Sequence, residues 1–180
     1  MMTGTENFPL QHIFDVADLK PEGNDVKVET TSQEREALAK FLDIPAIHQL
    51  TGVFHLSGND SRVKIRGEVR AAIEQTCTVS LEQFDDSIFE EVEVVFADIE
   101  SIRAEFGESV DLESELDAPD ELIDGKIDLG ALTAEFLALG LDPYPRKPGV
   151  KFSYDEGFEA PESPFAVLTG LKQTTQGNKE

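Results

Sequence analysis

The sequence predicts a single α+β domain in which a strongly twisted antiparallel sheet, or a partly open barrel, of about five to seven strands is covered by two main helices. One observation is a long stretch, Leu50–Ile73, in which apolar and polar residues alternate as in strands with one buried face. The other is a pair of apolar stripes at helical spacing, in Ser32–Leu42 and Asp128–Leu139. With 180 residues, 39% of them hydrophobic, the chain can bury one ordinary core. We expect the domain to span residues 1–152 and a poorly ordered tail to follow at 153–180.

The N-terminal part of the domain is expected to hold a short hairpin and the first helix. Phe8–Val16 and Val26–Thr30 have strand-like compositions, and the turn formers of Lys20–Asn24 separate them. Thr31 and Glu34 then have the spacing of a capping box, in which each side chain binds a backbone N–H of the other residue. A helix of about three turns should follow this cap.

A long hairpin gives the strongest strand signal. Leu50–Ser57 alternates between apolar and polar residues, Gly58–Ser61 contains turn formers, and alternation then resumes. One face of the returning strand is apolar, and the opposite face carries a basic stripe interrupted by Glu68. The basic stripe consists of Arg62, Lys64, Arg66 and Arg70. It is predicted to face solvent or a neighbour, and it could either contact RNA phosphate or pair with glutamates of an adjacent strand.

The apolar face of this strand continues through Cys77, Val79 and Leu81, which favours a bent or bulged strand extending past Glu74-Gln75-Thr76. Cys77 is then most simply a small buried side chain. Because it is the one cysteine of the chain, an internal disulfide and a cysteine-based metal cluster are excluded.

A further strand is expected at Ile88–Asp98, with Glu91 and Glu93 on its polar side, where they could pair with the basic stripe. Negative charge is concentrated around it. The window Asp85–Glu135 holds 18 acidic and two basic residues, so its net charge is −16 of the total −22. Within this window, Glu105–Asp120 lacks sustained periodicity and is interpreted as a mobile acidic loop.

The second helix leads into a proline-rich arm. Asp128 can cap the helix, and Gly140 suits its end. The predicted apolar face consists of Leu129, Leu132, Phe136 and Leu139. The arm that follows, LDPYPRKPG, carries Tyr144, Arg146 and Lys147. An aromatic ring beside two cations suits RNA, whereas a turn that closes the domain, with Tyr144 packed on the Leu139 side, is the alternative.

Composition excludes several classes of function. A net charge of −22 repels polyphosphates and anionic membranes and attracts basic proteins. The three histidines are scattered, no phosphate-binding glycine loop is present, and no nucleophile motif occurs, so we expect no catalytic residues, metal or cofactor. The sequence shows neither a signal peptide nor an apolar run of about 20 residues, which predicts a cytoplasmic protein without a membrane segment.

Four segments, in this order along the chain, resemble the YceD family, the large ribosomal RNA subunit accumulation proteins, and in particular its proteobacterial branch. They are SQEREALAKFLDI (Ser32–Ile44), GEVRAAIEQTCTVSLEQF (Gly67–Phe84), FEEVEVVFAD (Phe89–Asp98) and IDLGALTAEFLALGLDPYPRKPG (Ile127–Gly149). The resemblance covers about residues 8–152. Many members carry Cys-x-x-Cys where this chain has Cys77-Thr78-Val79-Ser80, so a thiol or metal role of that pair cannot be transferred to this chain.

The resemblance implies a cytosolic, non-enzymatic factor needed for synthesis, processing or stability of the large-subunit (23S) ribosomal RNA. The charge favours binding of a basic protein, such as a ribosomal protein or an assembly factor, with the RNA affected indirectly. The alternative hypothesis is direct RNA binding through Tyr144, Arg146 and Lys147 of the arm together with the basic stripe. The oligomeric state has no signature in the sequence.

Overall fold

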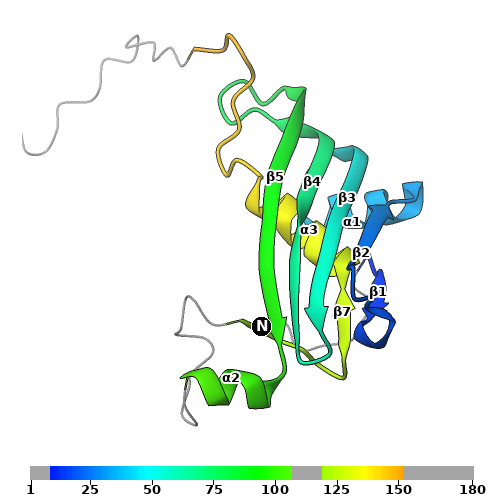
Figure 1. Cartoon of the computed structure of the whole chain (residues 1–180). Coiled ribbons are helices and arrows are strands. Elements are labelled where there is room, and N and C mark those ends of the chain that lie inside the picture. The colour runs from blue at the N-terminus through cyan, green and yellow to red at the C-terminus, as the bar shows by residue number, and fades with distance from the viewer. Residues whose placement is uncertain (1–8, 107–118, 152–180) are drawn as a thin grey trace, which may run out of the picture. The chain divides into compact units, whose positions relative to one another are not determined.

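In the computed structural model, residues 9–106 and 119–151 are described. The described residues up to Val150 belong to one compact unit. This unit is an α+β domain, as predicted, and its main sheet has the strand order β2-β3-β4-β5-β6 and does not close into a barrel (Figure 1). The strands of this sheet are β2 (Asn24–Glu29), β3 (Ala46–Asn59), β4 (Arg62–Thr76), β5 (Gln83–Ala97) and β6 (Asp120–Glu121).

Three long strands, β3 to β5, form the centre of the sheet as an antiparallel meander. The predicted turn between β3 and β4 is present, and the Asn59 side chain accepts hydrogen bonds from the N–H groups of Ser61 and Arg62. Gly58 is required there because it has φ +135°, and an added Cβ would lie 2.1 Å from the Arg62 carbonyl oxygen. The sheet is antiparallel as predicted except at one edge, where β6 pairs with β5 in parallel.

The expected opening hairpin is not formed. Within the segment predicted as its first strand, Ile13–Asp15 form β1, and the short 3-10 helix η1 (Val16–Asp18) follows. Strand β1 pairs with β7 (Lys126–Asp128) in a separate two-stranded sheet. The second strand, β2, pairs with β3 instead. The turn formers at Lys20–Asn24 therefore lie between two strands that do not pair with each other, because β1 pairs with β7 and β2 pairs with β3.

Both predicted helices are present. The first, α1 (Ser32–Phe41), begins with the complete capping box: Thr31 accepts from the N–H of Glu34, and Glu34 accepts from the N–H of Thr31. The second, α3 (Leu129–Leu139), is capped by Asp128, whose carboxylate accepts from the N–H groups of Gly130 and Ala131 and also of His12. The Asp128 carboxylate thus caps α3 and also holds the backbone at His12, the residue before β1.

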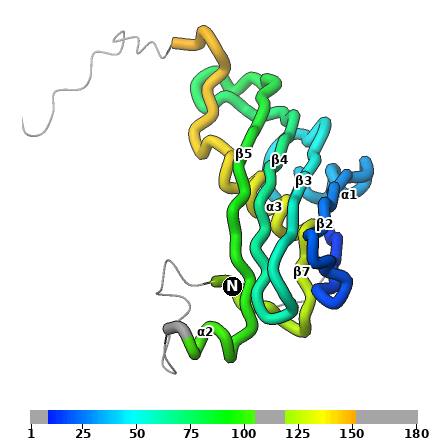
Figure 2. Tube along the Cα trace, in the orientation of Figure 1, coloured from blue at the N-terminus to red at the C-terminus, as the bar shows by residue number. Residues whose placement is uncertain are grey.

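Helix α3 crosses one face of the main sheet, as Figures 1 and 2 show, and its residues line the core. Gly52 of β3 permits the close approach, because a Cβ there would lie 2.6 Å from both Thr133 of α3 and the Phe54 ring. Leu137 is fully buried, whereas Leu139 is 70% exposed. The prediction was therefore wrong for Leu139, whereas Leu129 and Leu132 are buried and Phe136 packs against the core as predicted. The buried face is wider than predicted, because it also includes Thr133, Ala134 and Leu137.

The apolar face predicted for β4 is confirmed, because Val63, Ile65, Val69 and Ile73 are fully buried. Cys77 is buried as expected, but β4 ends at Thr76 and Leu81 is 77% exposed in the turn that follows, which corrects the predicted continuation of the strand. Periodicity alone cannot show where a strand stops, because a turn can place the next residues on either side.

An additional helix, α2 (Ile99–Phe106), precedes the segment predicted to be an acidic loop and overlaps it only at Glu105 and Phe106. Asp98 caps this helix by accepting from the N–H of Ser101. Residues 107–118 of that loop, the tail at 153–180 and Phe8 of the first predicted strand lie outside the described residues. Among the described residues, no helix is long and apolar enough to cross a membrane.

Candidate interaction surfaces

The face of the main sheet opposite α3 holds the basic stripe. Lys64, Arg66 and Arg70 alternate along β4 with the buried apolar residues, so they all point away from the core, as predicted. Arg62 lies at the start of β4, opposite Ala97 of β5, and its side chain is exposed.

Acidic side chains of the same face hold these cations. Glu93 of β5 pairs with both Lys64 and Arg66, and the Arg66 Nη2 donates to its carboxylate at 3.2 Å. Hydrogen bonds from Lys64 and then from Arg66 hold the pKa of Glu93 below its ordinary value. The cross-strand pairing expected for Arg66 is therefore confirmed.

Arg70 behaves differently from the prediction. Its guanidinium donates to both carboxylate oxygens of Glu68, two residues away on the same strand, at 2.8 and 3.1 Å, and it also lies 4.9 Å from the centre of the Phe89 ring. Hydrogen bonding to Arg70 lowers the pKa of Glu68. Glu91, expected as a partner of the stripe, lies instead directly opposite Glu68.

A row of polar and charged side chains from four neighbouring strands crosses this open face. In register, Asp25 of β2 lies beside His55 of β3, His55 beside Arg66 of β4, and Arg66 beside Glu93 of β5. The His55 Nδ1 and an Asp25 carboxylate oxygen are 2.7 Å apart. Cross-strand pairs of this kind stabilise a sheet by a few tenths of a kcal/mol each and leave little free positive charge for a polyanion.

The proline-rich arm is attached to the turn that follows β4. Both the N–H and the hydroxyl of Thr78 donate to the Pro145 carbonyl oxygen, at 2.9 and 3.2 Å. The ammonium of Lys147 lies 2.9 Å from the Glu82 carboxylate, and this pairing lowers the pKa of Glu82. The arm therefore closes one end of the domain, but Tyr144 is 72% exposed and not packed on the Leu139 side.

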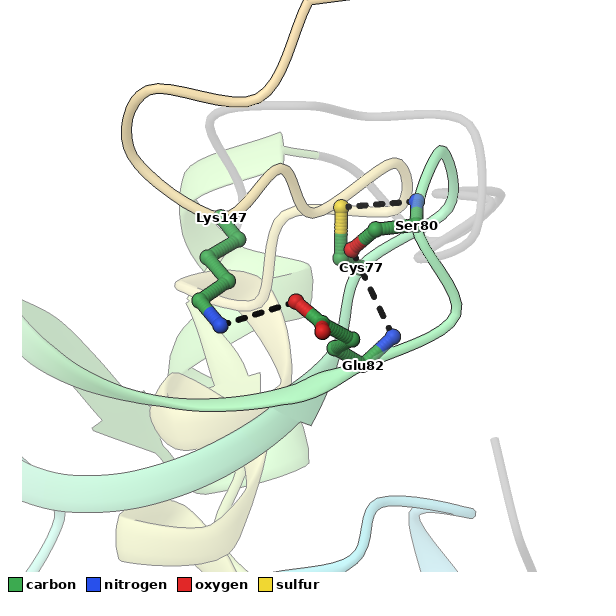
Figure 3. A network of polar contacts seen from close by, with 4 residues as sticks. All are labelled: Cys77, Ser80, Glu82 and Lys147. Carbon is green, nitrogen blue, oxygen red and sulfur yellow. Dashed lines mark hydrogen bonds and ion pairs between the residues drawn. The ribbon is translucent and has the colours of Figure 1, made fainter.

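The same turn contains Cys77-Thr78-Val79-Ser80, in which Ser80 stands where many members of the resembled family have the second cysteine of Cys-x-x-Cys. Figure 3 shows Cys77 and Ser80 facing each other, beside the ion pair of Glu82 and Lys147. The N–H of Ser80 donates to the Cys77 sulfur at 3.4 Å. Contacts with Ser80, first through its hydroxyl and then through its backbone N–H, lower the pKa of Cys77 to about 6. In the described part of the chain, no group of three or more histidine, cysteine or acidic side chains could hold a metal ion.

The structure separates the predicted site residues into two places. Lys64, Arg66 and Arg70 share the open face, with Arg62 at the end of their strand, whereas Tyr144, Arg146 and Lys147 lie on the arm at the β4–β5 turn. Arg146 is exposed and has no ion-pair partner among the described residues. Sequence reasoning missed Thr78 and Glu82 as anchors of the arm, because no local pattern links residues 65 or more positions apart.

A family model described as the large ribosomal RNA subunit accumulation protein YceD matches residues 65–172. This chain belongs to the YceD family. The match starts inside β4 and includes β5, α3 and the arm. No curated protein and no solved structure matches the chain. Membership gives this YceD-family protein a role in the accumulation of large-subunit ribosomal RNA, and its assignment to the proteobacterial branch stays a prediction.

Proposed function

We propose that this YceD-family protein is a cytoplasmic, non-enzymatic accessory factor of ribosome biogenesis that holds a basic protein partner and acts on 23S ribosomal RNA through that partner. The observation that carries the proposal is the charge balance of the sheet. Lys64, Arg66 and Arg70 are each held by a glutamate, while β5 carries five carboxylates and no basic residue.

A surface of this kind favours cations. Glu91, exposed on the open face, and Glu90, half-buried on the α3 side near Gly140, have no hydrogen bond or ion pair among the described residues. A Lys or Arg side chain brought beside either carboxylate would form a charge-assisted contact without breaking an existing one. The total charge of −22 adds long-range attraction for a basic protein and repulsion of RNA phosphate.

The test is co-purification from cell extract at low and high salt. We expect basic ribosomal proteins or assembly factors to bind at low salt and to be released as salt rises, because the attraction between exposed charges is screened. Recovery of no basic protein at low salt, or retention that salt leaves unchanged, would contradict the proposal.

Two double variants sharpen this test. Glu90→Gln with Glu91→Gln removes two charges of β5 that have no ion pair within residues 9–106 and 119–151, and Glu22→Gln with Asp60→Asn removes two exposed charges elsewhere in the domain. Both variants change the net charge by the same amount. Loss of partner in the first variant with retention in the second is expected, and equal loss in both would show that only the total charge matters.

Direct RNA binding by the arm remains the second candidate, favoured by the exposed Tyr144 ring and by the Arg146 guanidinium, which has no ion-pair partner in the described part of the chain. It predicts that Arg146→Ala with Lys147→Ala weakens the binding of ribosomal RNA in a gel-shift assay and reduces its salt dependence. A gel shift identical to that of the wild type would dismiss this candidate.

A further inference from the structure

Strand β5 forms an edge of the main sheet over most of its length. Its inner side pairs with β4 along all of Gln83–Ala97, but its outer side pairs with β6 only at Phe96 and Ala97. Among the described residues, no strand lies along the outer side of Asp85–Glu93, which we call the β5 edge (Figures 1 and 2).

The register shows which backbone groups point outward. On the β6 side, the Leu122 N–H donates to the Ala97 carbonyl oxygen at 2.7 Å. Because peptide groups alternate in direction along a strand, the outward N–H and C=O groups of the β5 edge belong to alternate residues counted back from Ala97. They belong to Asp85, Ser87, Phe89, Glu91 and Glu93.

Few of these groups have a partner. The Ser87 N–H donates to the carboxylate of the neighbouring Asp86 at 2.8 Å. No backbone group among the described residues binds the outward N–H of Phe89, Glu91 or Glu93. An exposed edge of this kind is a ready template for another strand.

Charge decides which strand fits. The β5 edge carries Asp85, Asp86, Glu90, Glu91 and Glu93 and no cation. A second copy of this chain would bring five more carboxylates to the edge and be repelled. Glu91 lies directly opposite Glu68 in the register, and because Arg70 holds the Glu68 carboxylate, a cation placed beside Glu91 would compensate the one carboxylate of this pair that no guanidinium holds among the described residues.

We propose that the β5 edge binds an extended segment of the basic partner as an added strand, with Lys or Arg at alternate positions. The inference rests on the proposed function and deepens it by naming the surface and the conformation of the partner. Backbone hydrogen bonds to Phe89, Glu91 and Glu93 supply affinity, and cationic side chains beside the carboxylates of the edge, above all the exposed Glu91, supply specificity. The edge is about 30 Å long at about 3.3 Å per residue, enough for a short tail of a basic protein.

The first test uses an alternating Lys-Val peptide as long as the edge, added to the full chain and followed by NMR. Slower exchange of the Phe89, Glu91 and Glu93 amides on addition of the peptide is expected. A peptide with Glu in place of Lys should not bind. Slow exchange of these amides before any peptide is added would overturn the inference, because the edge would already be covered by the chain itself or by a second copy.

The second test compares Glu91→Ala with Glu91→Pro. Both variants lose the carboxylate, but the proline also removes the outward N–H, and proline is tolerated on a strand edge. We expect Glu91→Pro to bind the peptide about fivefold to tenfold more weakly than Glu91→Ala, the effect of one backbone hydrogen bond. A thermal melt checks that both variants are folded.

The outcomes separate this inference from the proposed function. Equal affinity of the two variants would overturn strand addition, and so would equal binding of a peptide methylated at every backbone nitrogen, which keeps the charges and lacks the donors. In both cases salt-sensitive capture of a basic protein by the acidic surface would still stand.

Discussion

Leu137→Ala tests how α3 is packed on the sheet. Leu137 is fully buried in the core, and replacing it with alanine removes three carbon atoms, each contributing about 0.8 kcal/mol of transfer free energy. The transfer term is therefore about 2.4 kcal/mol, and the cavity left behind raises the expected loss to about 3–4 kcal/mol. Leu139→Ala is the matched control on the same helix, because Leu139 is 70% exposed and its loss should change stability by less than about 0.5 kcal/mol.

The assay is urea unfolding of both variants, followed by circular dichroism. With an m-value of about 2 kcal/mol/M, a loss of about 3 kcal/mol lowers the midpoint by about 1.5 M. Unchanged m-values would show that the cooperative unit is the same. Equal midpoint shifts for the two variants, or a larger shift for Leu139→Ala, would refute the assignment of the buried face of α3 and support the face expected from sequence spacing.

Three further predictions concern local interactions. Asp128→Ala removes the acceptor of three backbone N–H groups and should lower the free energy of unfolding by about 1–2 kcal/mol, whereas Asp128→Asn should lose less. Gly52→Ala should destabilise the fold by about 1–3 kcal/mol in the same urea assay, because the new methyl meets Thr133, and equal stability would contradict the close approach of α3. Ser80→Ala should raise the pKa of Cys77 from about 6 toward its ordinary value, measured by thiolate absorbance against pH. Because Cys77 has a lower pKa in the folded state than in the unfolded state, the thiolate contributes stability that is fully present above the pKa of the unfolded thiol and is lost as pH falls through about 6. The difference in unfolding free energy between wild type and Ser80→Ala should therefore shrink as pH falls toward about 6, and a constant difference would contradict the prediction.

Helix caps and central strands could be predicted because their signals are local. Both caps involve residues close together in the chain. Thr31 and Glu34 form the predicted capping box of α1, and Asp128 accepts hydrogen bonds from the first backbone N–H groups of α3. The open face of β4 was also predictable, because the side-chain direction in a strand alternates whatever the partner strand is. The identity of the glutamate that holds each cation was not predictable, since Arg70 donates to Glu68 of its own strand and contacts β5 through the Phe89 ring.

By itself, the sequence determined the α+β class, the central hairpin, the caps of α1 and α3 and the excess of negative charge around β5, because each depends on residue type and short-range periodicity. Only the tertiary structure decided that β1 pairs with β7, that β6 joins β5 in parallel, that Leu137 and not Leu139 is buried, and that the arm is anchored at Thr78 and Glu82. These features depend on which distant segments meet when the core closes. The free energy of that closure comes from burying apolar surface of the whole chain, which no local pattern records.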